Sequence, residues 1–291
     1  MVMMLVYRKI RQKMHKVLNR FKKKVPVYIP VLYGELLKGR TALVTGGTSG
    51  IGYSIAEAFI RNGAGVIITG RIQEKIDCAV DGLRKLFPSA FVLGIVMDNT
   101  DIKSLESGFT RLKTDLVGRT LDILVNNAGV LNSRTFRVIT ESDYDMVLDT
   151  NLKGTFFLSK LVCNYMVENK IHGNILNVAS SSSLRPAISP YTLSKWGLRG
   201  LTMGLAKTMI AHDLVVNGLA PGPTATPMLA REGIDDITRN ASPNARFSLP
   251  EEVANLSVIL VSEMGRTVVG DIVYATGGCG VLTLDDVGYE I

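Results

Sequence analysis

The sequence has few of the residues that bind metals or form disulfides. Its 291 residues include three histidines and three cysteines, and Cys78, Cys163 and Cys279 lie far apart without Cys-x-x-Cys spacing. We therefore expect free thiols in a reducing cytoplasm and no metal site. The chain also lacks an uninterrupted apolar run of about 18 residues, the minimum for a transmembrane helix, so we expect no membrane span.

The first 24 residues contain no acidic side chain, so the net positive charge of the protein is concentrated there. The formal net charge is +7, but residues 1–24 hold nine lysines and arginines and no acid. Residues 25–291 carry 24 basic and 26 acidic side chains. A slightly acidic body is a poor surface for nucleic acid, so no nucleic-acid partner is expected.

Residues 1–30 are interpreted as a basic amphipathic arm and connector, followed by a single domain over residues 31–291. Pro26 and Pro30 end any helix in the arm. The steps between its apolar residues predict a helix over residues 3–21 with one apolar stripe. Two interpretations remain open: the helix lies on an anionic membrane surface, at the inner face, or it packs in the oligomer. The stripe consists of Met3, Tyr7, Ile10, Met14, Val17 and Phe21.

Strand and helix patterns alternate from Thr41 onward. Strands are expected at Thr41–Thr45, Gly65–Thr69, Phe91–Met97, Leu121–Asn126 and Asn174–Val178, and near Val215 and Ile272. Helices are expected at Ser54–Asn62, Ile72–Phe87 and Ile102–Thr114, within 141–169, and after Tyr191. Apolar, β-branched strands alternating with helices predict an α/β domain with a doubly wound parallel sheet, a Rossmann fold.

A glycine-rich loop follows the first strand and precedes the first helix. It reads Thr-Gly-Gly-Thr-Ser-Gly-Ile-Gly over residues 45–52. Glycines let the backbone turn sharply and approach a pyrophosphate, and the helix N-terminus presents free N–H groups to it. In this strand–loop–helix setting the loop predicts dinucleotide binding. The expected contacts are Gly46, Thr48, Ser49, Gly50, Ile51 and Gly52.

The loop spacing and several later motifs resemble the short-chain dehydrogenase/reductase family. The motifs follow in the family's order over residues 39–280: Gly46-x-x-x-Gly50-x-Gly52, Asn126-Asn127-Ala128-Gly129, Asn151, Tyr191-x-x-x-Lys195 and Pro221-Gly222. The likeness is to the bacterial single-domain type, similar to 3-oxoacyl-acyl-carrier-protein reductases. It implies an NAD(P)-dependent oxidoreductase that moves a hydride between nicotinamide and a carbonyl or alcohol. It also implies a homo-oligomer, a dimer or a homotetramer.

The resemblance assigns catalytic roles to Asn151, Ser180, Tyr191 and Lys195. Tyr191 would be the acid/base, and Lys195, four residues along the same helix face, would lower its pKa and bind the nicotinamide ribose. Ser180 precedes Tyr191 by eleven residues instead of the commoner thirteen, so Ser182 stands as the alternative serine. A catalytically idle NADP-binding regulator on the same fold is the rival function.

The end of the second strand predicts NADP(H) over NAD(H). Gly70 stands where an NAD-preferring fold places a carboxylate, and Arg71 follows with a guanidinium suited to a 2′-phosphate. Asp98 is equally interpretable as a turn aspartate or as a residue that holds the adenine. The resemblance adds these cofactor contacts: Asp98, Asn99, Asn126, Ala128, Gly129, Tyr191, Lys195, Pro221, Gly222, Thr224 and Thr226.

The substrate remains open between an acyl thioester and a sugar-type carbonyl. The expected substrate loop, Met228–Phe247, is of mixed polarity. At the positions where the family's arginines dock an acyl carrier, the sequence has Lys170 and His212.

Overall fold

The computed structural model describes residue 14, residues 34–229 and residues 236–283. The chain divides into two units, Met1–Val31 and Leu32–Ile291. Apart from Met14, the helix predicted over residues 3–21 lies outside the described residues. Residues 230–235 of the predicted substrate loop also lie outside them. None of the described helices is long and apolar enough to cross a membrane.

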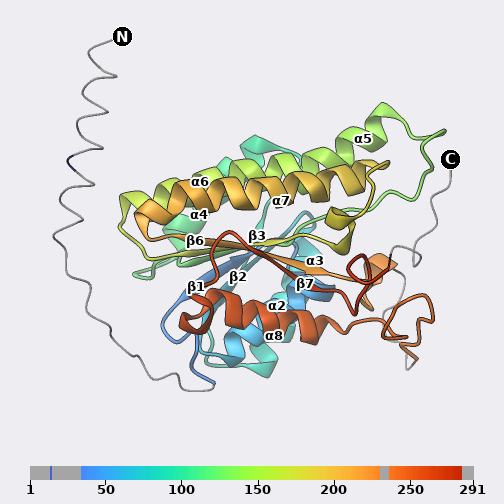
Figure 1. The fold of residues 1–291 in the computed structure, drawn as a ribbon. Coiled ribbons are helices and arrows are strands. Elements are labelled where there is room, and N and C mark those ends of the chain that lie inside the picture. Colours follow the sequence, from blue (N-terminus) through green and yellow to red (C-terminus); the bar gives the residue numbers. More distant parts are fainter. Residues whose placement is uncertain (1–13, 15–33, 230–235, 284–291) are drawn as a thin grey trace, which may run out of the picture. The chain divides into compact units, whose positions relative to one another are not determined.

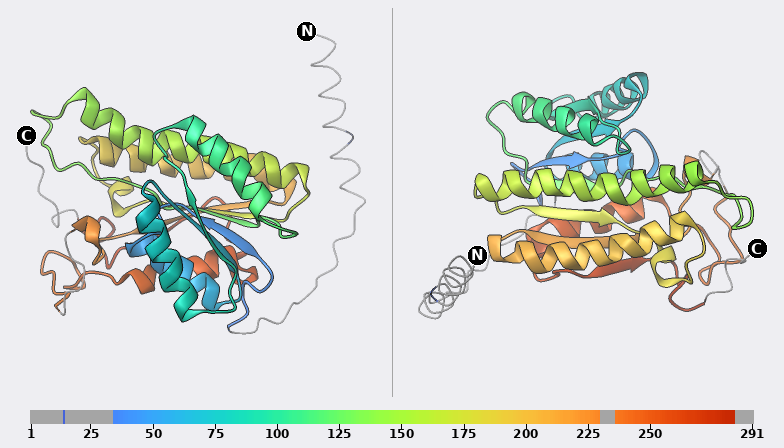
Figure 2. Two further views of the ribbon diagram at one scale, coloured as in Figure 1. Left: turned by 180° about the vertical axis from the view of Figure 1, so that it is seen from behind. Right: turned by 90° about the horizontal axis from the view of Figure 1, so that it is seen from above.

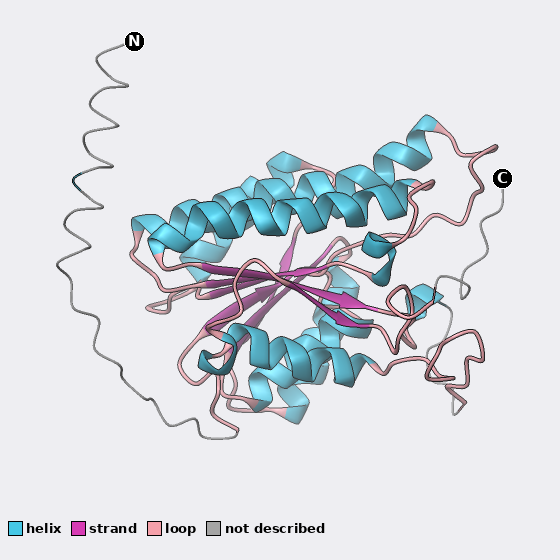
Figure 3. Ribbon diagram, in the orientation of Figure 1, coloured by secondary structure: helices cyan, strands magenta, loops and turns pink. Residues whose placement is uncertain are grey.

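Within the described ranges, seven parallel strands form one sheet in the order β3-β2-β1-β4-β5-β6-β7 (Figure 3). The order confirms the predicted doubly wound Rossmann-type sheet. It reverses between β1 and β4, and ligands bind at the carboxyl ends of the strands at such a reversal. The strands are β1 (Thr41–Val44), β2 (Gly65–Gly70), β3 (Val92–Val96), β4 (Ile123–Asn126), β5 (Asn174–Val178), β6 (Val215–Pro221) and β7 (Ile272–Ala275).

Helices cover both faces of the sheet (Figures 1 and 2). One face carries α2 (Gly50–Arg61), α3 (Gln73–Leu86) and α8 (Pro250–Val261). The other carries α4 (Ile102–Asp115), α5 (Glu141–Leu148), α6 (Gly154–Glu168) and α7 (Pro190–Met209). The described residues also form short helical turns: η1 (Asp149–Lys153), η2 (Ser181–Leu184), η3 (Ile210–His212), η4 (Pro227–Leu229) and η5 (Glu263–Gly265).

The apolar strand residues feed two separate cores. In β1, Ala42 and Val44 pack into the core beneath α2, α3 and α8, whereas Leu43 points into the core beneath α4 and α6. This alternation follows from the two-residue period of a strand, and it explains why the strands are apolar at successive positions.

Two helices differ from the sequence-based expectation. α2 begins at Gly50, inside the glycine loop, four residues before the expected Ser54. No helix was expected at α8, because its apolar residues run almost around the helix and hide a period of 3.6. Its start carries ordinary signals: Pro250 in the first turn, and Glu252 accepting a hydrogen bond from the backbone N–H of Leu249 at 2.8 Å.

Candidate active site

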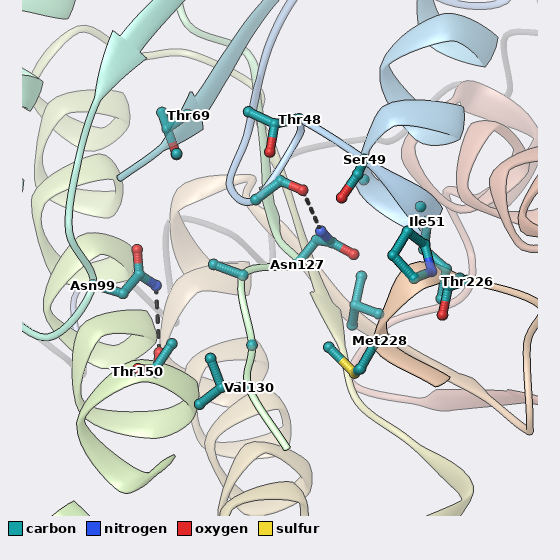
Figure 4. A pocket seen from close by; sticks show the side chains of 18 of the residues that line it. Thr48, Ser49, Ile51, Thr69, Asn99, Asn127, Val130, Thr150, Thr226 and Met228 are labelled. Atoms are coloured by element: carbon teal, nitrogen blue, oxygen red, sulfur yellow. Dashed lines mark hydrogen bonds between the residues drawn. The ribbon is translucent and has the colours of Figure 1, made fainter. Parts of the chain in front are cut away.

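A cavity of about 330 Å³ opens at the carboxyl edge of the sheet. Its walls come from the loops that follow β1 to β6 and from the first turns of α7. Figure 4 shows Ser49, Ile51 and Thr226 on one side of it and Asn99 and Thr150 on the other. The cavity therefore lies where the reversal of strand order predicts a ligand site.

Most residues of the predicted cofactor site line this cavity. They are Gly46, Thr48, Ser49, Gly50, Ile51, Gly52, Arg71, Asn99, Ala128, Gly129, Tyr191, Lys195, Pro221 and Thr226. Further residues of the cavity wall were not among the expected cofactor contacts: Thr69, Gly70, Ile72, Lys75, Met97, Asn127, Val130, Thr150, Val178, Ala179, Pro227 and Met228.

The glycine loop is folded tightly against the strand end that follows β4. Gly46 has a φ of +62°, and a Cβ there would lie 2.9 Å from the Cα of Ala128. A Cβ on Gly52 would collide with the carbonyl oxygen of Gly46. The Nδ2 of Asn127 donates to the carbonyl oxygens of Thr45 and Gly46 at 3.0 and 3.1 Å (Figure 4). Asn127 therefore fixes the loop conformation, a role that the sequence reading missed.

The start of α2 fits an anionic group. Ser49 caps the helix without a side-chain hydrogen bond, and no acidic residue lies in the first turn. The N–H groups of this turn thus receive no side-chain acceptor, while Ser49, Gly50 and Ile51 line the cavity. A helix N-terminus in this state attracts a phosphate through its N–H groups and its dipole. The residues present therefore fit a dinucleotide pyrophosphate.

Two basic side chains line the cavity beyond the end of β2. Arg71 was expected there, and Lys75, four residues later in the first turn of α3, joins it. Lys75 was not expected from the sequence. Gly70 also has a packing role, because a Cβ there would lie 3.0 Å from Cγ2 of Thr48.

Tyr191 lies in the first turn of α7, which is capped firmly. Ser189 accepts a hydrogen bond from the N–H of Thr192 at 3.2 Å, and Pro190 occupies the first helical position. Burial raises the pKa of Tyr191, and a hydrogen bond with the side chain of Ser180 lowers it by less. The pKa of Tyr191 therefore stands above its ordinary value.

Among Ser180–Ser183, the hydrogen bond to Tyr191 comes from Ser180. The neighbouring residues hold it in place: the N–H of Ser182 donates to Ser180 Oγ at 3.1 Å, and Ser183 Oγ donates to the Ser180 carbonyl at 2.8 Å. With an interval of eleven residues in sequence, Ser180 and Tyr191 are therefore still close enough to form a hydrogen bond.

Lys195 is buried one helical turn beyond Tyr191, with 5% of its surface exposed. Its Nζ donates to the carbonyl oxygen of Val178 at 3.0 Å and lies 5.6 Å from the centre of the Tyr191 ring. Burial lowers the pKa of Lys195 to about 8. Burial of Tyr191 outweighs the lowering of its pKa by Ser180, and the lowering expected from Lys195 stays a prediction.

Asn151 is fully buried in the π-helical turn η1 between α5 and α6. Its Oδ1 accepts the N–H of Val130 at 2.8 Å, and its Nδ2 donates to the Val130 carbonyl at 3.0 Å and to Ser194 Oγ at 3.1 Å. Asn151 thereby ties the loop after β4 to the residue beside Lys195. A π-helical turn inside a longer helix is often found at functional sites.

Four predicted cofactor contacts, Asp98, Asn126, Gly222 and Thr224, do not line the cavity. The carboxylate of Asp98 accepts the N–H and the hydroxyl of Thr100 at 2.9 and 2.8 Å, which is the turn interpretation. Its neighbour Asn99 does line the cavity.

The other three residues support the walls from behind. Asn126 Nδ2 donates to Ser159 Oγ at 2.9 Å and to Asn177 Oδ1 at 2.8 Å, which joins β4 to α6 and β5. Thr224 Oγ1 donates to the carbonyl of Gly222 at 3.0 Å. These contacts position the strand ends that surround the cavity.

Comparison with known proteins identifies the family to which the chain belongs. The family model described as short chain dehydrogenase matches residues 40–236. A 3α-hydroxysteroid dehydrogenase of Mediterraneibacter gnavus is 34% identical over 246 residues, which cover 83% of this chain and 97% of the relative. A 3-oxoacyl-[acyl-carrier-protein] reductase of Aquifex aeolicus is 33% identical over 246 residues, covering 83% and 98%.

Solved structures of dehydrogenases have the same fold as this chain. A gluconate 5-dehydrogenase from Burkholderia cenocepacia J2315, in complex with NADP and tartrate, superposes with a TM-score of 0.76 at 27% identity. The match covers 84% of this chain and 97% of that one. The region matched by the family model contains strands β1 to β6, the glycine loop and the Tyr191–Lys195 pair.

Proposed function

The chain belongs to the short-chain dehydrogenase family, and we propose that it transfers a hydride between NADP(H) and a carbonyl or alcohol carbon with Tyr191 as the acid/base. Family membership makes it a dehydrogenase or reductase acting on hydroxyl or carbonyl groups. The observation that carries the proposal is the Ser180–Tyr191 hydrogen bond beside the buried Lys195, at the wall of a cavity that fits a dinucleotide.

The chain offers a separate group for each part of the cofactor. The loop from Gly46 to Gly52 and the start of α2 would hold the pyrophosphate. Arg71 and Lys75 would bind the 2′-phosphate, which supports NADP(H) over NAD(H). Lys195 would hydrogen-bond the nicotinamide ribose. The bound nicotinamide supplies or accepts the hydride.

Tyr191 would move the proton that accompanies the hydride. In reduction its hydroxyl donates the proton to the carbonyl oxygen, while Ser180 donates a hydrogen bond to the same oxygen. The raised pKa keeps Tyr191 protonated at neutral pH, so it is ready to act as an acid. With a pKa of about 8, Lys195 carries its ammonium charge at pH 7 and stabilises the phenolate that forms.

Alcohol oxidation, the reverse reaction, requires Tyr191 in its deprotonated form. Alcohol oxidation needs the phenolate of Tyr191 as a base, and the raised pKa makes that form scarce at neutral pH. Asn151 would act as a positioning residue, through its bonds to Val130 and Ser194.

We also propose that the protein works in the cytoplasm as a homo-oligomer, a dimer or tetramer. The outer faces of α6 and α7 support this assembly, because they expose large apolar side chains that a subunit contact would cover. These are Phe156, Leu193, Trp196, Met203 and, just beyond α7, Ile210.

A matched serine pair tests the proposal. Ser180→Ala should lower kcat for NADPH-dependent reduction across a panel of carbonyl compounds by about 100-fold or more, a typical loss for one oxyanion donor. Ser182 lies in the same turn, with its backbone N–H 3.1 Å from Ser180 Oγ. The kcat of Ser182→Ala should stay within about twofold of the parent value. A greater loss in Ser182→Ala would move the catalytic role to that serine. If the parent protein binds NADPH and reduces none of the panel, the idle regulator is the correct function.

A further inference from the structure

Exposed apolar side chains gather on the loops that leave the carboxyl edge of the sheet. All strands are parallel, so the loops after β4, β5, β6 and β7 emerge at the edge where the cavity opens. The side chains have exposed fractions between 38% and 78%. We call them the apolar rim: Leu131, Phe136 and Val138 after β4, Ile188 before α7, Met228 and Leu229 after β6, and Val281 and Leu282 after β7.

Two contacts join the rim to the reacting groups. Met228 itself lines the cavity, and so does Val130, the residue before Leu131 (Figure 4). A Cβ on Gly280 would lie 3.1 Å from the carbonyl oxygen of Ser181. The segment that carries Val281 and Leu282 therefore lies against η2, the turn that begins directly after Ser180.

The cavity that Tyr191 lines has several apolar side chains in its wall as well. They are Val130, Val178, Ala179, Pro221, Pro227 and Met228. Among the described residues, the charged side chains that line the cavity are Arg71, Lys75 and Lys195. The first two lie beyond β2, and Lys195 bonds to the carbonyl of Val178.

This distribution of charge argues against an anionic substrate. Arg185, which follows η2, is 3% exposed and is not part of the lining. A sugar acid or a phosphorylated sugar would lose hydration at the tyrosine end of the cavity. The cation that the described lining offers there is Lys195, which is 5% exposed and already donates to the Val178 carbonyl. An apolar body would instead cover the rim and remove its side chains from water.

We infer that the substrate is a ketone or secondary alcohol carried on an apolar body larger than a hexose, which reaches from Tyr191 onto the apolar rim. The inference rests on the proposed function and narrows its substrate. It sets aside the sugar-type carbonyl that the sequence left open. The rim side chains act as specificity determinants, since they contact the body of the substrate and not its carbonyl.

Substrate preference is the first test. The full-length protein is assayed for NADPH oxidation with a rigid polycyclic ketone (5α-androstane-3,17-dione), a straight-chain ketone (2-decanone), cyclohexanone and 5-keto-D-gluconate. At least one of the two large apolar ketones should exceed cyclohexanone in kcat/KM by more than about 100-fold, because several partly exposed apolar side chains become covered. A higher kcat/KM for 5-keto-D-gluconate than for either large ketone would overturn the inference while leaving hydride transfer in place.

A matched set of variants tests the rim itself. Ile188→Ser and Leu282→Ser should each raise KM for the preferred large ketone by about five- to tenfold, with kcat and the KM for cyclohexanone changed less than twofold. The control is Ile259→Ser, an isoleucine of similar exposure, 39% against 46%, near the end of α8 where the chain turns toward the amino edge of β7. It should leave every constant unchanged.

Direct binding separates this inference from the proposed function. In Tyr191→Phe with NADP⁺ present, calorimetry should detect the large ketone, and Ile188→Ser should weaken that binding by the same factor as its KM. Such binding in a parent protein that reduces none of the probes would overturn hydride transfer and leave the inference standing. If the rim variants change the oligomeric state in light scattering and leave KM for the large ketone unchanged, the rim is a subunit contact and the inference is wrong.

Discussion

Replacing Lys195 by methionine should stabilise the folded protein at neutral pH while removing its catalytic function. The ammonium is buried, and burial lowers its pKa from 10.5 to about 8. Each pKa unit corresponds to about 1.4 kcal/mol, so the charge lowers the free energy of unfolding by roughly 3 kcal/mol at pH 7. The lost hydrogen bond to the Val178 carbonyl, 3.0 Å long, offsets about 1 kcal/mol. A net gain of about 2 kcal/mol remains.

The pH dependence of this gain has a definite sign. Below about pH 8 the lysine is protonated in both the folded and the unfolded chain, so the full destabilisation is present. Between about pH 8 and 10.5 the folded protein has released the proton while the unfolded chain still holds it. The parent therefore gains stability relative to the variant as pH rises through this window, and the contribution of the buried charge vanishes near pH 10.5.

Urea unfolding followed by circular dichroism at pH 7 and pH 10 measures the effect. The control is Lys207→Met, an exposed lysine on the same helix, which should change the free energy of unfolding by less than about 0.5 kcal/mol at either pH. A Lys195→Met variant less stable than the parent at pH 7, or a gain that does not shrink at pH 10, would refute the reasoning from burial.

Three further predictions concern the cofactor, the assembly and the arm. Arg71→Ala and Lys75→Ala should each raise KM for NADPH by about tenfold or more and KM for NADH by less than about twofold; equal effects on both cofactors would contradict the NADP assignment. Trp196→Asp and Met203→Asp, on the exposed side of α7, should shift the oligomer to smaller species in light scattering, and a parent that is already monomeric would refute the interface. Deleting residues 1–24 should abolish binding to anionic vesicles at low salt and leave turnover of a soluble substrate intact. If the full-length protein ignores such vesicles and the deletion changes the oligomeric state, the arm is an assembly element.

The fold was predictable wherever the sequence pattern is local and strong. β5 has the predicted bounds, Asn174–Val178, because its apolar run lies between clear turn residues. The same logic failed for α8. Its buried residues, among them Val253, Val258 and Val261, lie on one face, but the other face carries the apolar Leu256 and the exposed Ile259. The sequence therefore lacks the one-sided apolar stripe that marks an amphipathic helix.

The site was predictable where a motif is contiguous and less so where the fold brings distant residues together. The glycine loop and the Tyr191–Lys195 pair are set by sequence spacing, and both line one cavity. Lys75 was missed because its approach to the cavity depends on how α3 leaves β2. The upward pKa shift of Tyr191 comes from burial, which a four-residue spacing does not reveal.

The kcat and the cofactor affinity of Tyr191→Phe test the central claim most directly. The substitution removes one hydroxyl and keeps the ring. NADPH oxidation with the preferred ketone should therefore fall in kcat by about 100- to 10,000-fold, the usual contribution of a general acid. The Kd for NADPH, measured by the fluorescence of the bound cofactor, should stay within about twofold, because the hydroxyl is proposed to act on the substrate oxygen. A variant that retains more than about a tenth of the parent kcat, with unchanged Kd, would contradict the assignment of Tyr191 as the acid/base.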